Sequence, residues 1–207
     1  MKRARVLLAD DHRMVAEGLK SLLSPEFDLV GIVEDGRALV DEARRLKPDV
    51  IVADITMPRL NGLEAMALLR KDNPAVRVVV ITMHRESAYA RRALAAGASG
   101  FVLKHSAPTE LIAAIHAALE GRTFVTPELA GNAGPIADGD AGPALTERQR
   151  EILQLLARGK TAKEIASLLG VSVRTVEFHK YKMMEAVGAA NSAELIHYAI
   201  KHAIVAI

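Results

Sequence analysis

The first 120 residues alternate between two patterns of apolar positions. Continuous apolar runs are typical of strands buried on both faces, and apolar residues three and four apart are typical of amphipathic helices. The runs predict strands at residues 5–9, 29–33, 50–53, 76–82 and 100–103. The helical pattern follows each run, at residues 14–23, 37–46, 63–70, 87–96 and 111–119. Five such β–α repeats with short connections predict an α/β fold, a doubly wound five-stranded parallel sheet with helices on both faces.

The pattern changes after residue 121. The stretch 131–143 holds four Gly and two Pro in 13 residues, a composition typical of a linker between domains. From Leu145 onward the pattern is helical only, and it predicts four helices, at residues 146–158, 161–169, 172–187 and 191–204. We therefore divide the chain into an α/β domain, a linker that starts with one helical turn at 126–130, and a small all-α domain, at residues 1–122, 123–142 and 143–207.

The helical domain has clear start and stop signals. Thr146 with Gln149, and Thr161 with Glu164, have the spacing of capping boxes. Gly170 and the residue after it are all that separates the second predicted helix from the third. A tight turn with Gly between two short helices is typical of a helix-turn-helix.

Composition and charge narrow the function classes. The net charge is +2, but residues 143–207 carry nine Lys/Arg and six Asp/Glu, or +3, and the first 142 residues carry 18 and 19, or −1. A basic C-terminal domain favours a nucleic-acid partner. The absence of Cys excludes a disulfide framework and Cys-ligated metals. The apolar run at 6–9 is too short for a signal peptide, and none reaches the about 18 residues of a membrane span. We expect a cytoplasmic protein without a membrane partner.

Charged and polar residues stand at the carboxyl ends of the predicted strands. The first strand is followed by Asp10 and Asp11, the third by Asp54, the fourth ends in Thr82, and the fifth is followed by Lys104. Ligand sites of doubly wound sheets lie at these ends. Three carboxylates so close repel one another unless a cation holds them, and Mg²⁺ with its preference for oxygen ligands suits the site. Beside a cation, one Asp can act as a nucleophile toward a phosphoryl group. Taken singly, each Asp could instead be a helix N-cap.

These residues, with Asp54-Ile55-Thr56-Met57-Pro58, Gly62 and the run Gly97 to Lys104, resemble the receiver domain of bacterial two-component response regulators. The resemblance implies that Asp54 accepts a phosphoryl group from a sensor histidine kinase. It also implies that Asp10, Asp11, Asp54 and the backbone carbonyl of Thr56 hold Mg²⁺, and that Thr82 and Lys104 bind the phosphoryl oxygens.

Three further residues have expected roles or positions relative to the predicted phosphoacceptor site. Phe101 would be the switch aromatic that turns inward as Thr82 moves, or else a plain core residue of the last strand. Met83 is larger than the small residue common after the switch Thr, so it would crowd the phosphoryl group. His84 is expected to be a solvated loop residue.

The third C-terminal helix has two distinct faces. At about 100° per residue, Val176, Met183 and Val187 form one apolar stripe. The opposite face mixes cations and aromatic rings, which suits a major groove, although an ordinary amphipathic surface helix has the same stripe.

The strings Leu145 to Leu153, Gly159 to Ala166 and Ser172 to His179 are similar to the LuxR-type helix-turn-helix domain. Gln149 stands where an acidic residue is usual in this domain. Glu177 stands where Lys is frequent, so the resemblance does not settle whether Glu177 contacts DNA. The resemblance implies DNA contacts by residues of the second and third helices: Lys163, Arg174, Thr175, Glu177, Phe178, His179, Lys180, Tyr181 and Lys182.

Together the two parts resemble a NarL/FixJ-type response regulator, a transcription regulator and not an enzyme. The implied partners are a sensor histidine kinase, double-stranded DNA, a second copy of the chain when phosphorylated, and RNA polymerase. The last helix would form the dimer contact through residues including Leu195, Tyr198, Ala199 and Ala203.

Two other functions remain open. An Asp-nucleophile phosphohydrolase needs an acid/base Asp two residues after the nucleophile, but position 56 is Thr. A receiver that only binds proteins, with a helical domain that no longer binds DNA, is kept open by Glu177.

Overall fold

The computed structural model describes residues 3–85, 87–130, 145–201 and 204–205. The chain divides into two compact units, residues 1–134 and 135–207, and each is described here by itself. Within the described residues, no helix combines the length and the apolar character needed to cross a membrane.

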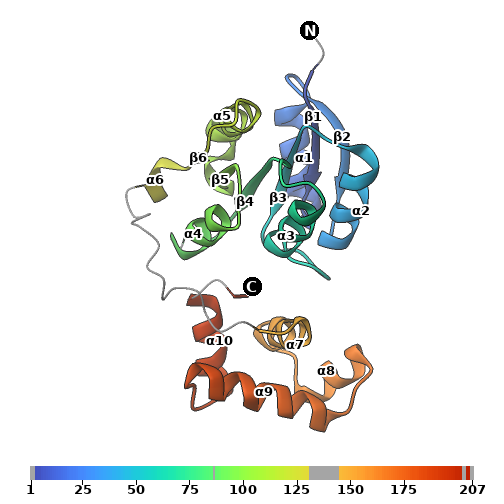
Figure 1. Ribbon diagram of the computed structural model, residues 1–207, viewed down its shortest axis with the longest axis vertical. Helices are drawn as coiled ribbons and strands as arrows, with labels where there is room; N and C mark the ends of the chain where they lie inside the picture. Colours follow the sequence, from blue (N-terminus) through green and yellow to red (C-terminus); the bar gives the residue numbers. More distant parts are fainter. Residues whose placement is uncertain (1–2, 86, 131–144, 202–203, 206–207) are drawn as a thin grey trace. The chain divides into compact units, whose positions relative to one another are not determined.

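The first unit is built on a fully parallel sheet (Figure 1). Its strands are β1 (Arg5–Ala9), β2 (Asp28–Val33), β3 (Val50–Asp54), β4 (Val78–Thr82), β5 (Gly100–Leu103) and β6 (Phe124–Val125). Their order in the sheet is β2-β1-β3-β4-β5-β6. The strand order reverses between β1 and β3, which makes the carboxyl ends of these two strands the topological switch point, where ligands bind in such folds.

Helices cover both faces of this sheet. They are α1 (Arg13–Leu23), α2 (Gly36–Leu46), α3 (Gly62–Asp72), α4 (Ser87–Ala95) and α5 (Ala107–Leu119). On one face, Leu19 of α1 and Leu111 of α5 pack with alternate strand residues such as Val52 and Ile81 in one core cluster. The apolar pattern predicted five of these strands and the five helices, because the central strands β3, β4 and β5 bury both faces and each helix buries one.

The sheet has a sixth strand that the sequence analysis missed, and it lies in the region predicted to be linker. Residues 124–130 contain β6 and the short helix α6 (Pro127–Ala130), and β6 pairs with β5. Two strand residues are too few to show a period of two, so only the helical turn at 126–130 was visible in the pattern. The rest of the predicted linker, residues 131–142, lies outside the described residues.

The second unit consists of α7 (Glu147–Ala157), α8 (Ala162–Leu169), α9 (Val173–Val187) and α10 (Ser192–Lys201). Both predicted capping boxes are present: the side chains of Thr146 and Thr161 accept from the backbone N–H of Gln149 and Glu164. Gly170 takes the left-handed conformation, φ +64°, that ends α8 and lets α9 begin three residues later. Ile152, Ile165 and Val176 meet in a single core.

The last helix does not present the apolar surface expected for a dimer contact. Leu195 and Ala199 lie in the core of the unit, 1% and 0% exposed, because α10 packs against α7 and α9. Tyr198 is half-buried and packs against the same core. Ala203 lies outside the described residues.

Candidate phosphoacceptor site and DNA-binding face

Two buried carboxylates meet at the switch point of the sheet. Asp54 ends β3, and Asp10 follows β1, whose Ala9 pairs with Ala53. Asp10 is 0% exposed and Asp54 is 2% exposed. One ligand atom from each of Asp10, Asp11, His12 and Asp54 lies within 4.8 Å of the others. The structure therefore brings together the three carboxylates that the sequence analysis selected.

Lys104 supplies the counter-charge for this pair. It follows β5, and its Nζ lies 2.7 Å from Asp10 Oδ2 and 2.8 Å from Asp54 Oδ2. Its side chain is only 6% exposed. Burial of three charges in one place is tolerated because the ammonium group stands between the two carboxylates.

Burial changes the protonation of these groups. The pKa of Asp54 is raised to about 6, chiefly by desolvation and also by the nearby Asp10 charge, against the lowering effects of Lys104 and of a hydrogen bond from the Thr56 backbone. Burial acts to lower the pKa of Lys104, but the carboxylates of Asp54 and Asp10 outweigh it and the pKa is raised. Asp54 is thus mostly ionised at neutral pH and Lys104 is charged.

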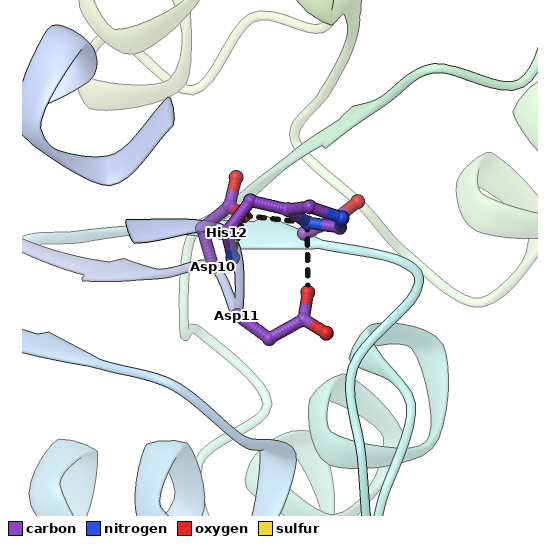
Figure 2. A group of neighbouring side chains, drawn as sticks. Asp10, Asp11 and His12 are labelled. Atoms are coloured by element: carbon purple, nitrogen blue, oxygen red, sulfur yellow. Dashed lines mark hydrogen bonds and ion pairs between the residues drawn. The ribbon is translucent and has the colours of Figure 1, made fainter. Parts of the chain in front are cut away.

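His12 belongs to the acidic cluster, although the sequence analysis did not select it. Its backbone N–H donates to Asp10 Oδ1 at 2.9 Å. Its ring Nδ1 lies 3.0 Å from Asp11 Oδ1 and 3.3 Å from Asp10 Oδ1 (Figure 2). The only signal in the sequence was its position directly after the two Asp residues.

The carboxylates suit a hard cation. Asp10 Oδ2 and Asp11 Oδ1 are buried, and nitrogen atoms lie against both: Lys104 Nζ is 2.7 Å from Asp10 Oδ2 and His12 Nδ1 is 3.0 Å from Asp11 Oδ1. Buried carboxylates are costly unless positive charge balances them, and three carboxylates here share the one ammonium group of Lys104. An all-oxygen donor set of this charge matches the ligand preference of Mg²⁺.

His84 is not the solvated loop residue expected from the sequence. Its Nε2 lies 3.1 Å from Thr56 Oγ1, and its backbone N–H donates to Thr82 Oγ1 at 3.2 Å. Its ring stacks on buried Tyr89 of α4, with ring centroids 4.5 Å apart. Met83, in contrast, is 68% exposed, and the expectation that it crowds a phosphoryl group stays a prediction.

The two predicted switch residues are both completely buried. Thr82 ends β4 and Phe101 lies on β5, each with 0% exposure. Phe101 thus lies in the core. Burial is expected both for a switch aromatic and for a plain core residue, so it does not distinguish the two.

The third C-terminal helix, α9, has the two faces that its pattern predicted. Val176 and Met183 are fully buried. Phe178 and Tyr181 are 57% and 61% exposed. The other exposed residues on or next to this face, several of them charged, are Val173, Arg174, Glu177, Lys182 and Glu185. Exposed aromatic rings among charges on one helix form a surface suited to nucleic acid.

Two of the lysines on α9 are paired with glutamates of the same helix. Lys180 Nζ lies 2.5 Å from Glu177 Oε2, and Lys182 Nζ lies 2.8 Å from Glu185 Oε2. Thr175 is part of the helix start, with its Oγ1 2.8 Å from Ser172 Oγ. The rings of Phe178 and His179 contact each other edge to face. Lys163 of α8 is exposed.

Comparison with known proteins assigns both units. Residues 6–116 match the response regulator receiver domain, and residues 143–199 match the bacterial regulatory proteins of the luxR family. The transcriptional regulatory protein UhpA of Salmonella typhimurium is 38% identical, over 93% of this chain and 95% of the relative. The transcriptional regulatory protein MctR of Rhizobium johnstonii is 33% identical, over 98% and 96%.

Solved structures agree with this assignment. A structure of two RcsB dimers bound to two parallel DNAs is 28% identical, with a TM-score of 0.62, over 97% of this chain and 99% of the other. The receiver domain of the putative response regulator NarL from Mycobacterium tuberculosis is 35% identical, with a TM-score of 0.57, over 59% and 100%.

The two units therefore define a DNA-binding response regulator of a two-component system, a class of regulators rather than of enzymes. Within that class, the chain belongs to the NarL/FixJ type.

Proposed function

We propose that a sensor histidine kinase phosphorylates this protein on Asp54, and that the phosphoryl group controls its dimerisation and its binding to DNA. The observation that carries the proposal is the Lys104 ammonium group, which contacts both Asp10 and Asp54 at the switch point of the sheet. Lys104 shields the charge of the Asp54 carboxylate, so an anionic phosphoryl group can approach it.

Mg²⁺ would be held by Asp10, Asp11, Asp54 and the backbone carbonyl of Thr56, and when bound it would neutralise charge on the phosphoryl oxygens. Asp54 contributes an ionised carboxylate oxygen that bonds to phosphorus while the bond to the donor breaks. Lys104 and the hydroxyl group of Thr82 would then bind the phosphoryl oxygens. Burial of Thr82 and Phe101 links this step to the core of the unit.

The DNA-binding function would rest on α9. Its exposed face would enter the major groove, with Arg174, Phe178 and Tyr181 near base edges and with Lys182 and Lys180 near phosphates. Thr175, Glu177, His179 and, from α8, Lys163 complete the proposed contact surface. Dimers would place two such helices on successive half-sites.

Mass measurement tests the phosphoacceptor. Acetyl phosphate with Mg²⁺ should add one phosphoryl group to the full chain, and Asp54→Asn should abolish the addition. Equal labelling of the Asn variant would show that Asp54 is not the acceptor.

A gel shift with and without the phosphodonor then tests control of DNA binding. Phosphorylation without any DNA binding would favour the second candidate, a protein-binding receiver whose helical unit has lost DNA recognition, for which the Glu177 charge on α9 is the supporting observation.

A further inference from the structure

The segment β6–α6, residues 124–130, joins the end of the receiver to the chain that leads to the DNA-binding unit. It lies beside β5 at the edge of the sheet (Figure 1). Phe124 N–H donates to Ser99 O at 3.2 Å, and Thr126 N–H donates to Phe101 O at 2.9 Å. Leu129 of α6 is 3% exposed. The segment is therefore an integral part of the sheet, and it contacts the strand that carries both Phe101 and, at its end, Lys104.

A buried hydroxyl group fixes the centre of this segment. Thr126 is 1% exposed. Its Oγ1 accepts from Leu103 N–H at 3.1 Å and donates to Glu110 Oε2 of α5 at 2.6 Å. Leu103 is the residue before Lys104, so this hydrogen bond ties Thr126 to the chain immediately next to Lys104.

One carboxylate of the segment reaches both loops of the phosphoacceptor site. Glu128 Oε2 lies 3.1 Å from His105 Nε2, and Glu128 Oε1 lies 3.8 Å from Arg85 Nη1. His105 directly follows Lys104, and Arg85 lies three residues after Thr82. Lys104 and Thr82 are the two residues that would bind the phosphoryl oxygens. Glu128 thus connects the loops that phosphorylation would rearrange.

The hydrogen bonds of the site indicate how these contacts would break. Thr82 Oγ1 now accepts the His84 N–H. If the hydroxyl group turns toward a phosphoryl group on Asp54, the His84 N–H loses this acceptor, and the loop that carries Arg85 must move. The contacts of Glu128 are between partly exposed side chains. Such pairs are weak, so a small movement is enough to break them.

We propose that β6–α6 is a latch between the phosphoacceptor site and the linker. In the unphosphorylated protein, Glu128 holds α6 against the two loops, and phosphorylation of Asp54 breaks these contacts and releases the segment. The latch rests on the proposed phosphorylation of Asp54, and it assigns to Glu128 and Thr126 a role in passing the signal toward the DNA-binding unit.

Hydrogen exchange on the full chain tests the release. With acetyl phosphate and Mg²⁺, the amides of Phe124, Thr126 and Leu129 should exchange about fivefold faster, as expected when a weak stabilising contact is lost. Asp54→Asn should show no acceleration. Unchanged exchange at 124–130 in protein that intact mass shows to be phosphorylated would overturn the latch alone. Failure of the wild type to take up a phosphoryl group would overturn the proposed function and the latch with it.

Glu128→Gln tests the contact itself. The variant removes the charge that faces Arg85 and His105. We expect fast exchange at 124–130 without phosphodonor, unchanged phosphoryl uptake by mass, and an about fivefold smaller gain in DNA affinity on phosphorylation. Glu120→Gln is the matched control, because it removes a surface partner of Arg122 in the same unit without touching either loop. Glu128→Gln that behaves like Glu120→Gln in all three measurements would overturn the latch.

Discussion

The Nζ atom of Lys104 lies 2.8 Å from Oδ2 of Asp54, although the two residues are 50 positions apart in the chain. The contact exists because β3 and β5 flank β4 and all three end at the same edge of the sheet. Both side chains are almost fully buried, so neither has water as an alternative partner.

Lys104→Met should therefore destabilise the protein. The substitution keeps the apolar stem but leaves Asp10 and Asp54 buried without their cation, and breaking a buried pair costs about 3–5 kcal/mol. Mg²⁺ should restore part of the loss because it binds the folded state. Urea unfolding with and without Mg²⁺ measures both effects. Lys71→Met, at an exposed position of α3, serves as the control. Equal stability of the two variants would mean that Lys104 does not balance the buried charges.

Binding of Mg²⁺ should depend on pH through Asp54. Burial, with the Asp10 charge, raises the pKa of Asp54 to about 6 in the metal-free protein. A proton on Asp54 competes with the metal, so affinity should fall as the pH drops through this pKa. At pH 5, about one tenth of Asp54 is ionised, and the affinity should be about tenfold lower than at pH 8. Calorimetric titration at both values measures the ratio. The ratio should shrink in Asp54→Asn, and an unchanged ratio in that variant would exclude Asp54 as the competing group.

The sequence predicted most of the fold because each main element buries an apolar surface with a regular period. Thr146 and Thr161 also marked two helix starts within one residue, since capping boxes are local. The missed features depend on contacts between distant residues. β6 consists of two residues and exists through its pairing with β5. His84 meets Thr56 across 28 positions, and burial of Leu195 and Ala199 follows from how α10 packs, which no local pattern shows.

Glu177 should weaken the binding of DNA by holding Lys180. The two charges lie 2.5 Å apart on the same face of α9. Glu177→Gln frees the ammonium group and removes a negative charge beside the DNA phosphates, so affinity should rise about fivefold or more and the salt slope should steepen by about one. Glu151→Gln, which breaks the similarly spaced pair with Arg148 on α7, is the control. Weaker binding by Glu177→Gln, confined to sites with one particular base pair, would instead show that Glu177 accepts a hydrogen bond from cytosine.

Lys182 and Tyr181 are neighbours on α9, but we expect them to serve different parts of the DNA. Lys182 carries an ammonium group on a long stem, 48% exposed and paired with Glu185 at the surface, and such a weak pair leaves it available to phosphates. Tyr181, 61% exposed, presents a rigid ring and a hydroxyl group that suit base edges and thymine methyl groups. Lys182→Ala should weaken binding to all sequences about equally and reduce the salt slope by about one. Tyr181→Ala should cost about 1–3 kcal/mol at one or two base pairs and leave the slope unchanged. Binding isotherms at two salt concentrations, on a preferred and a scrambled site, separate the two effects. Neither side chain lies in the core of the unit, so an unchanged affinity in both variants would mean that this face of α9 does not contact DNA.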